Sequence, residues 1–348
     1  MKKIGIQIEK KQAEIVRKYL IENNLLIKNL KITRDKNYVY FPVKNLPNES
    51  IKYKSVNMEF EIIENIPKSY KEIIEIPEHL KEKLPTSYDV VGDIIILKIP
   101  KDLELHKYKI GNSFLKINKN IRSVYNTSSI SGEFRTRNLE IIAGEKNSRT
   151  IHKEYDLRFY LDIRKTYFSP RLAEERKRIA SIVNPGEIVV DMFTGIAPFS
   201  IMIAKYASPK IVYAFDKNKN AIEFAKENIK LNNVVDKIEV FNIDSKNIEE
   251  ILKKKTSEVD RIIMNLPFSA HKYLPYALQL ISDNCIIHYY DMIKEKNLEI
   301  RIEQLKNIGN NHDISFVDHK VRKIKTYSPR EFYIAIDITA MKKQADVA

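Results

Sequence analysis

Three acidic residues in the second half of the chain each follow a short apolar run: Asp191, Asp216 and Asp244. Apolar runs of this length, alternating with helical patterns, indicate parallel strands, and α/β sheets bind ligands at the carboxyl ends of such strands. One carboxylate can accept both hydroxyls of a ribose, and Asp216 lies 25 residues after Asp191, close to the spacing at which nucleotide folds place such an acid. Asp244 can accept a hydrogen bond from an adenine amino group. The pattern predicts a site for a ligand that contains a nucleoside.

The segment after Asp191 predicts a tight turn that leads into a helix. Gly195 allows the backbone to approach a ligand closely, and Pro198 suits the first position of a helix. No Gly-x-Gly-x-x-Gly run occurs in the chain, so the phosphate cradle of a nicotinamide or flavin dinucleotide is not predicted.

A fourth apolar run ends in Asn265-Leu266-Pro267-Phe268. This sequence resembles the Asn-Pro-Pro-aromatic motif of methyltransferases that modify a nitrogen of a planar base. The amide of Asn265 and the next carbonyl can bind the edge of a base, and Pro267 restrains the loop that presents them. Together with the three acids, the motif predicts a methyltransferase domain that uses S-adenosyl-L-methionine.

Composition narrows the class of protein. The chain has 348 residues with 60 Lys and Arg against 46 Asp and Glu, a formal net charge of +14, which favours a polyanionic partner. The single cysteine, Cys285, lies in an apolar run and is expected to be a buried thiol, so we predict neither a disulfide nor cysteine chemistry. No secretory signal or membrane span is apparent, and no metal site is predicted, so we expect a cytoplasmic monomer.

The same patterns predict how the chain is divided. Residues 1–66 are predicted to be a small α/β domain with a helix at Lys11–Glu22, and 67–85 a linker that contains a helix. Residues 86–165 read as an α+β domain that begins with a hairpin and carries closely spaced basic and aromatic side chains, a mixture that suits RNA. Residues 166–348 alternate strands and helices as in a Rossmann-like domain, doubly wound around a mostly parallel sheet.

Several motifs occur in order over the last 220 or so residues of the chain. They include Gly132-Glu133-Phe134-Arg135, Tyr167-Phe168-Ser169-Pro170-Arg171-Leu172, Glu175-Arg176, Asp191-Met192-Phe193, Pro198-Phe199-Ser200, Asn265-Leu266-Pro267, His288-Tyr289-Tyr290 and Tyr327-Ser328-Pro329-Arg330-Glu331. With these motifs the sequence resembles the archaeal and eukaryotic tRNA (guanine-37-N1)-methyltransferases. The resemblance implies tRNA as partner: the first domain would read the shape of the elbow, and the other two would hold the anticodon stem-loop.

The resemblance also implies roles for individual residues. Arg135 would steady the negative charge that develops on guanine O6, and Tyr167 would pack against the flipped base or the cofactor. The expected cofactor-binding residues are Asp191, Phe193, Gly195, Pro198, Phe199, Asp216, Asp244, Asn265 and Arg176. The expected substrate-binding residues are Tyr167, Arg171, Asn265, Pro267, Arg137, Tyr327, Pro329 and Arg330.

Glu175 is the candidate general base, because guanine N1 carries a proton that must be removed before methylation. It lies on the apolar stripe of a helix that Ser169 and Pro170 are expected to begin, where burial would raise the pKa of its carboxyl. Helical spacing alone favours another role, an ion pair with Arg171 or Arg178. The resemblance shifts our prediction to the base.

The sequence departs from the family pattern at three places. Ala197 occupies the position where the family often has the second glycine of the cofactor turn, Ala173-Glu174 replaces a small Gly-Gly or similar pair, and Phe268 follows Asn-Leu-Pro. Three other functions stay open: transfer of an aminocarboxypropyl group to a wyosine precursor of tRNA, additional methylation of that precursor, and RNA binding without catalysis.

Overall fold

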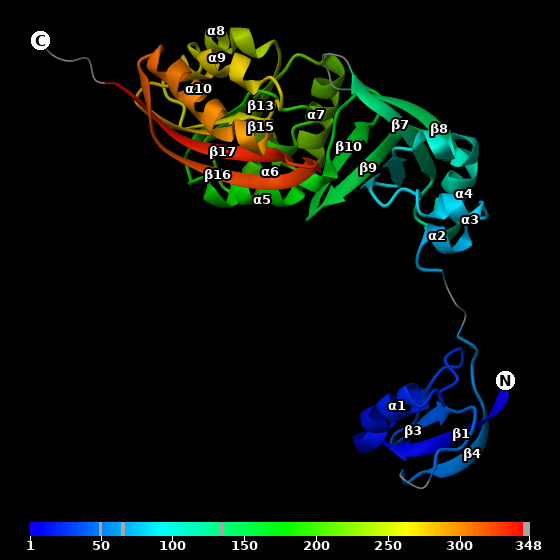
Figure 1. Cartoon of the computed structure of the whole chain (residues 1–348). Helices are drawn as coiled ribbons and strands as arrows, with labels where there is room; N and C mark the ends of the chain where they lie inside the picture. The colour runs from blue at the N-terminus through cyan, green and yellow to red at the C-terminus, as the bar shows by residue number, and fades with distance from the viewer. Residues whose placement is uncertain (49–50, 64–66, 132–135, 344–348) are drawn as a thin grey trace, which may run out of the picture. The chain divides into compact units, whose positions relative to one another are not determined.

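The structure is a computed structural model that describes residues 1–48, 51–63, 67–131 and 136–343, with the backbone alone at 129–131 and 136–137 (Figure 1). The chain separates into two units, Met1–Glu72 and Ile73–Ala348, which we describe one by one. Arg135 and its motif lie outside the described residues, as does the side chain of Arg137.

A four-stranded sheet forms the first unit, in the order β2-β3-β1-β4. Its elements are β1 (Lys2–Glu9), α1 (Ala13–Glu22), β2 (Thr33–Arg34), β3 (Tyr38–Pro42) and β4 (Lys54–Glu59). Val16 and Leu20 of α1 are buried against Ile6 and Phe41, which confirms the predicted amphipathic helix. The strand we expected at 58–63 ends instead at Glu59, because that residue pairs with Lys2, where β1 begins.

The stretch predicted as a linker is partly folded. It holds two short helices, α2 (Tyr70–Ile73) and α3 (Glu78–Lys81), and it buries the side chains of Tyr70, Ile74 and Leu84. Apolar side chains that are removed from water stabilise a fixed conformation. Much of this stretch is therefore folded and is not a flexible linker.

A second four-stranded sheet follows, in the order β5-β6-β7-β8. It consists of β5 (Tyr88–Val91), β6 (Ile94–Leu97), β7 (Ser123–Ser131) and β8 (Thr136–Gly144), with α4 (Lys107–Ile117) packed on it. The predicted hairpin is confirmed: β5 and β6 pair antiparallel across Gly92, whose φ of 58° is a conformation that glycine adopts without strain.

The hairpin of β9 (Arg149–Glu154) and β10 (Leu157–Asp162) forms a sheet of its own, paired as predicted across Tyr155. The helix α7 (Lys219–Leu231) holds it through side chains. Asn228 accepts from the Tyr160 amide at 2.7 Å and donates to the Tyr160 carbonyl at 3.0 Å. Asn232 makes the same pair of bonds with Arg158, at 3.0 and 2.8 Å. The hairpin is therefore docked on the sheet domain that follows it.

The large domain is built on a seven-stranded sheet in the order β13-β12-β11-β14-β15-β17-β16. The strands are β11 (Ile188–Asp191), β12 (Ile211–Asp216), β13 (Ile238–Asn242), β14 (Arg261–Met264), β15 (Asn284–Lys294), β16 (Ile314–Ser328) and β17 (Glu331–Lys342). The strands β11 to β15 run parallel, and β17 pairs antiparallel with β15 on one side and with β16 on the other (Figure 1). This is the predicted Rossmann-like, mostly parallel sheet.

Helices cover both faces of this sheet, as a doubly wound fold requires. One face buries side chains of α5 (Ala173–Ile182), α6 (Pro198–Tyr206) and α7. The other buries α8 (Ile248–Leu252), α9 (Leu274–Leu278) and α10 (Leu298–Asn310). Cys285 lies in this second core, where burial raises the pKa of its thiol, and this confirms it as a core residue. Among the described residues, no helix is long and apolar enough to cross a membrane.

Candidate functional site

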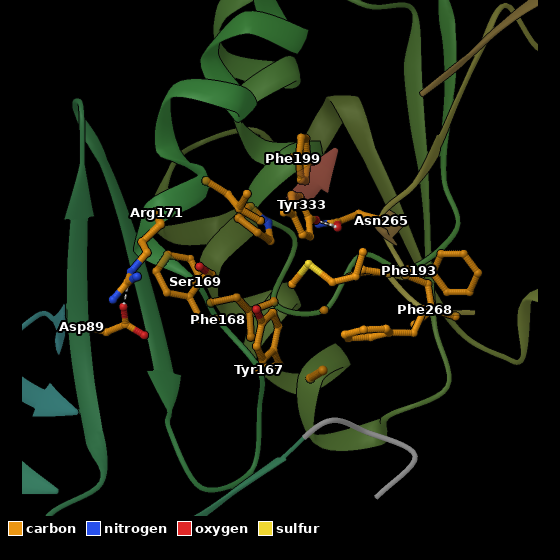
Figure 2. A pocket seen from close by; sticks show the side chains of 18 of the residues that line it. Asp89, Tyr167, Phe168, Ser169, Arg171, Phe193, Phe199, Asn265, Phe268 and Tyr333 are labelled. Carbon is orange, nitrogen blue, oxygen red and sulfur yellow. Dashed lines mark hydrogen bonds and ion pairs between the residues drawn. The ribbon is translucent and has the colours of Figure 1, made fainter. Parts of the chain in front are cut away.

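One cavity of about 1080 Å³ opens where the strand order of the large sheet reverses, between β11 and β14 (Figure 2). Ligands of doubly wound folds bind at this switch point. The segments after both strands line the cavity, at Phe193–Ile196 and Pro198 and at Asn265–Ser269. Residues 87–89 and 96–98 of the preceding sheet line it as well. Its volume is at the upper end for a small-molecule site, so it has room for two ligands side by side.

The turn after β11 leaves space for a ligand. Gly195 has a φ of 56°, and a Cβ added there would find nothing nearer than the Tyr167 carbonyl, 3.9 Å away. Ala197 also has a positive φ, 66°, so the departure from glycine there places a Cβ in a conformation that L-residues rarely adopt. Pro198 begins α6 as predicted.

Asp191 lies beneath this turn and is not among the residues that line the cavity. The Ser200 hydroxyl donates to Asp191 at 2.7 Å and contacts the Thr194 hydroxyl at 3.0 Å. Burial raises the pKa of Asp191 to about 6, although the bond from Ser200 opposes the shift. In this structure Asp191 is therefore buried behind the turn, and its direct contact with the cofactor stays a prediction.

Asp216 and Asp244 do line the cavity. Asp216 accepts from the backbone amides of Gly195 and Asn218, each at 2.8 Å, and this orients its carboxylate beside the turn. Burial raises its pKa against those two bonds. Asp244 accepts from the Lys246 amide at 3.0 Å and pairs with Lys217 at 3.6 Å.

The loop after β14 is held from two sides. The Tyr333 hydroxyl of β17 donates to the Asn265 amide oxygen (Figure 2). Phe268 has a φ of 75°, and its backbone amide donates to Asp291 at 3.2 Å. Asp291 is fully buried and is paired with Arg301 at 3.0 Å. A strained loop conformation persists only where its surroundings fix it, and Asp291 and Tyr333 do so here.

Two arginines predicted to bind ligands line the cavity with their charges already paired. Arg176 is buried, donates twice to Glu154 at 2.7 Å and once to the Ser169 carbonyl at 3.0 Å. Arg171 donates to Asp89 of β5 at 2.7 Å and to Ser87 at 3.0 Å, which joins the start of α5 to the preceding sheet (Figure 2). Both therefore brace the wall of the cavity.

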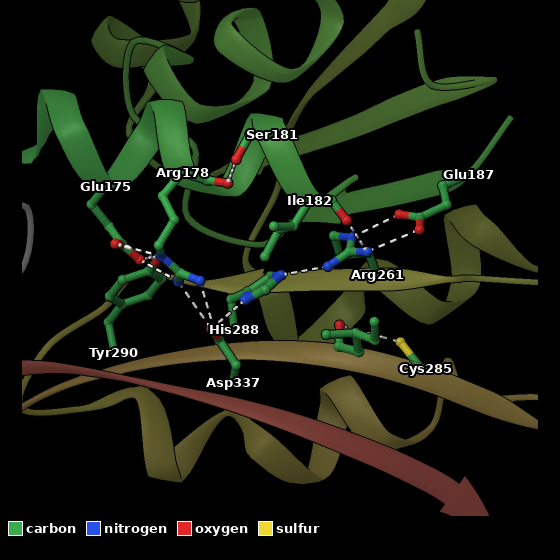
Figure 3. A network of polar contacts seen from close by, with 11 residues as sticks. Glu175, Arg178, Ser181, Ile182, Glu187, Arg261, Cys285, His288, Tyr290 and Asp337 are labelled. Atoms are coloured by element: carbon green, nitrogen blue, oxygen red, sulfur yellow. Dashed lines mark hydrogen bonds and ion pairs between the residues drawn. The ribbon is translucent and has the colours of Figure 1, made fainter. Parts of the chain in front are cut away.

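Glu175 does not line the cavity. Its buried carboxylate accepts from Arg178 at 2.7 and 2.8 Å and from the Tyr290 hydroxyl at 2.7 Å (Figure 3). Arg178 also donates to Asp337, at 2.7 and 3.1 Å. The alternative that helical spacing suggested, an ion pair with Arg178, is therefore present in the structure. Pro170 begins a 3-10 turn before α5, and the Ser169 side chain makes no capping bond.

The remaining predicted residues also divide into those that line the cavity and those that do not. Tyr167, Pro267, Tyr327, Phe193 and Phe199 line the cavity. Pro329 and Arg330 do not line it, because they form the turn between β16 and β17, where Arg330 has a φ of 63°.

Several residues that line the cavity were not predicted from the sequence: Asp89, Lys98, Met292, Lys325 and Tyr333. Asp89 was visible as the acid of the predicted hairpin. Lys325 lies on β16 and Tyr333 on β17, and no local pattern specifies that these strands pair with each other and that β17 pairs with β15.

Three family models match the chain. The TRM5/TYW2 methyltransferase domain matches residues 150–317, the TYW2 N-terminal domain matches 70–147, and the tRNA methyltransferase 5 N-terminal domain matches 5–51. The first match begins at the β9–β10 hairpin, which the structure docks on α7.

Two curated relatives cover most of the chain. The tRNA (guanine(37)-N(1))-methyltransferase Trm5b of Pyrococcus abyssi is 40% identical over 336 residues, covering 96% of this chain and 98% of its own. The tRNA(Phe) (4-demethylwyosine(37)-C(7)) aminocarboxypropyltransferase of Methanocaldococcus jannaschii is 39% identical over 251 residues, covering 72% of this chain and 96% of its own.

Solved structures that resemble this protein carry the same two names, Trm5 and TYW2. The complex of aTrm5 and tRNALeu superposes with a TM-score of 0.76 at 37% identity and covers 97% of this chain and 99% of its own. M. jannaschii TYW2 in complex with AdoMet superposes with a TM-score of 0.56 at 31% identity and covers 74% of this chain and all of its own. With the cavity at the switch point, these similarities show that the chain belongs to the TRM5/TYW2 family of methyltransferases.

Proposed function

We propose that this protein transfers the methyl group of S-adenosyl-L-methionine to N1 of guanosine 37 in tRNA, next to the anticodon. One observation supports the proposal above the others: a single cavity contains both the Gly195 turn and the Asn265–Phe268 loop. A methyl donor and an acceptor base have to meet within one enclosed site for direct transfer. The near-complete coverage of a relative named for this reaction supports the same choice.

The residues of the cofactor half fit S-adenosyl-L-methionine. The open space at Gly195 admits a ligand close to the backbone, and Asp216 is already oriented to accept from ribose hydroxyls. Asp244 stands at the next strand end, where it can accept from an adenine amino group. The bound cofactor supplies an electrophilic methyl carbon on its sulfonium. Phe193 and Phe199 line the same half and exclude water from it.

We assign the target base to the other half of the cavity. Asn265, fixed by Tyr333, presents its amide to a base edge, and Tyr167 offers a flat ring on the same wall. A base in an anticodon loop must leave its stack to enter such a site, and stacking on aromatic side chains offsets part of that cost.

Removal of the N1 proton is the step for which we propose Glu175 as general base and Arg135 as the partner of guanine O6. Glu175 can accept a proton only after its ion pair with Arg178 loosens. Arg178 would keep its two bonds to Asp337, so release of Glu175 does not leave a buried guanidinium unpaired. This sharing lowers the cost of freeing the carboxylate when RNA binds.

The proposal also includes a role for the small N-terminal domain and a cellular compartment. Residues 5–51 match the tRNA methyltransferase 5 N-terminal domain, and we propose that this unit contacts the tRNA elbow. A tRNA substrate implies that the protein acts in the cytoplasm.

A second candidate is transfer of an aminocarboxypropyl group to a wyosine precursor. The match of residues 70–147 to a TYW2 domain and the 39% identity to an aminocarboxypropyltransferase favour it. The match of residues 5–51 and the longer coverage by the Trm5b relative favour methyl transfer.

Nucleoside mass spectrometry decides between the two. The protein is incubated with S-adenosyl-L-methionine and tRNA that is either unmodified or carries 4-demethylwyosine at position 37. We expect a single methyl group on guanosine of the unmodified tRNA. A gain of an aminocarboxypropyl group on the wyosine precursor, with no methylated guanosine, would replace our proposal with the second candidate.

A further inference from the structure

The strand β16 forms one edge of the large sheet (Figure 1). A dense group of cations lies on this strand. The strand carries Lys320, Arg322, Lys323 and Lys325 within six residues. The first three are exposed, and Lys325 is half-buried at the wall of the cavity. A cluster of this sign on one strand attracts a polyanion.

The pairing of β16 with β17 sorts these cations onto two faces, because residues directly opposite each other point to the same face. Lys320 opposes Asp337, Arg322 opposes Ala335, and Lys325 opposes Tyr333 after a bulge at residue 324. Tyr333 lines the cavity, and the Lys325 ammonium lies 5.3 Å from its ring centre. Lys320 and Arg322, which we call the edge row, therefore share with Lys325 the face on which the cavity opens.

Lys323 points to the opposite face. It opposes Ile334, a residue of the core covered by α8, α9 and α10, and it pairs with Glu295 at 2.8 Å. The carboxylate nearest the row, Asp337, is engaged by Arg178 at 2.7 Å and by His288 at 2.6 Å. Among the described residues no carboxylate pairs with Lys320 or Arg322, so the positive charge of these two side chains is available to a ligand, whereas that of Lys323 is balanced locally.

Two exposed aromatic rings lie on the wall of the cavity, near the end of β16. Tyr327 is 58% exposed and Phe268 48% exposed, and their ring centres lie 6.4 Å apart at an angle of 76°. Large rings that stay in water beside a cation row provide surfaces on which bases stack, as in sites for single-stranded nucleic acid.

We propose that Lys320 and Arg322, the edge row, bind successive phosphates of one RNA strand that leads to the cavity, and that Tyr327 and Phe268 stack the base beside the target. Alternate residues of a strand are about 6.6–6.8 Å apart, a step comparable to that between successive phosphates. The inference rests on the proposed function and names the part of the chain that guides the substrate. Cations on an edge strand also prevent edge-to-edge association, and the test separates the two roles.

The test compares Lys320→Gln/Arg322→Gln with Lys323→Gln in the full chain, using a tRNA transcript with guanosine 37. We expect the dissociation constant of the double variant for tRNA to rise roughly tenfold, and the slope of log affinity against log salt to fall by about 1.4, which corresponds to two lost phosphate contacts. Lys323→Gln, on the same strand but the opposite face, should bind tRNA like the wild type.

Stacking is tested at Tyr327. Tyr327→Phe keeps the ring and should keep the affinity, whereas Tyr327→Ala should weaken tRNA binding by roughly tenfold. Equal binding by Tyr327→Ala and the wild type would overturn the stacking part of the inference.

Two results would overturn the edge row. One is unchanged affinity and salt slope in the double variant, with increased self-association, which would leave only protection of the sheet edge. The other is an equal loss of affinity in Lys323→Gln, which would indicate a general charge effect. Methyl transfer is read separately: a wild type that binds tRNA through this row but transfers no methyl group would contradict the proposed function and not the row.

Discussion

Asp216 is the residue on which the cofactor half of the site most depends. Its two oxygens are fixed by the amides of Gly195 and Asn218, so it meets a ligand without reorganising. We expect Asp216→Ala to raise the dissociation constant of S-adenosyl-L-methionine roughly tenfold or more, the usual effect of losing a charged hydrogen bond of 1.5–3 kcal/mol. Calorimetry measures it, with the exposed Asp236→Ala as a charge-matched control.

If Asp216→Ala binds the cofactor as tightly as the control, the ribose assignment is wrong. A thermal melt of both variants shows whether the loss reflects unfolding, because Asp216 also tethers the turn.

Glu175 has two candidate roles that kinetics can separate. If it is the base, Glu175→Gln slows single-turnover methyl transfer by about 10²–10⁴-fold while tRNA and cofactor affinities stay within a few-fold. Arg178→Gln removes its ion-pair partner and should destabilise the protein without abolishing transfer. An unchanged single-turnover rate in Glu175→Gln would leave it a structural residue.

At this scale the sequence predicts residue types better than their orientation. Gly195, Asp216 and Asn265 follow apolar strands directly, so the edge of the sheet brings them together. Asp191 and Glu175 belong to equally clear motifs, yet both turn away from the cavity, toward Ser200 and Arg178. Packing on the two sides of a helix or turn decides such an orientation, and local sequence does not contain it.

Among the elements, the β9–β10 hairpin shows how a small sheet is docked without a shared ladder. Asn228 of α7 and Asn232, the residue at the C-terminal cap of that helix, lie one turn apart and bond to the backbone of β10. We expect Asn228→Ala to lower the free energy of unfolding by about 1–3 kcal/mol, because it leaves buried backbone groups of Tyr160 without their partner. Urea unfolding measures the change.

Asn220→Ala is the matched control on the same helix, since that side chain is exposed. Equal stabilities of the two variants would show that the amide bonds do not hold the hairpin. Hydrogen exchange at Tyr160 should accelerate in Asn228→Ala alone.

Elements with a strong period were predictable, and those fixed by distant pairing were not. α7 and β12 appear where 3.6-residue and continuous apolar patterns place them. β16 is a long strand with many charged and exposed residues, and only its pairing with β17, which in turn pairs with β15, defines it. The docking of β10 depends on two asparagines that resemble ordinary helix-surface residues in the sequence.

On the scale of the whole domain, a chain of buried charges links α5 to the central strands (Figure 3). It runs from Glu175 through Arg178 and Asp337 to His288, which contacts Arg261 at 2.8 Å. Burial alone would raise the pKa of Asp337, but hydrogen bonds from His288 and Arg178 outweigh it and hold that pKa well below its usual range.

The sign of the resulting pH dependence follows from this lowered pKa. The folded state keeps Asp337 charged at a pH where the unfolded chain, with the ordinary value of 3.8, takes up a proton. The stabilisation is complete above that value and is lost as pH falls toward the folded pKa. Asp337→Asn should cost about 2–4 kcal/mol at pH 7, and the difference from the wild type should shrink below about pH 4.

Urea unfolding from pH 7 to 3 tests this, with Asp318→Asn on β16 as an exposed control. A difference between wild type and Asp337→Asn that stays constant down to pH 3 would mean that the carboxylate of Asp337 does not carry the stabilisation.

The central claim is that the cavity between β11 and β14 methylates guanosine 37 of tRNA. The most direct measurement uses unmodified tRNA transcripts that differ only in carrying guanosine or another base at position 37, followed by nucleoside analysis. We predict 1-methylguanosine from the guanosine transcript and no methylated nucleoside from the others. Methylation that is independent of the base at position 37, or no methylation of the guanosine transcript, would contradict the account.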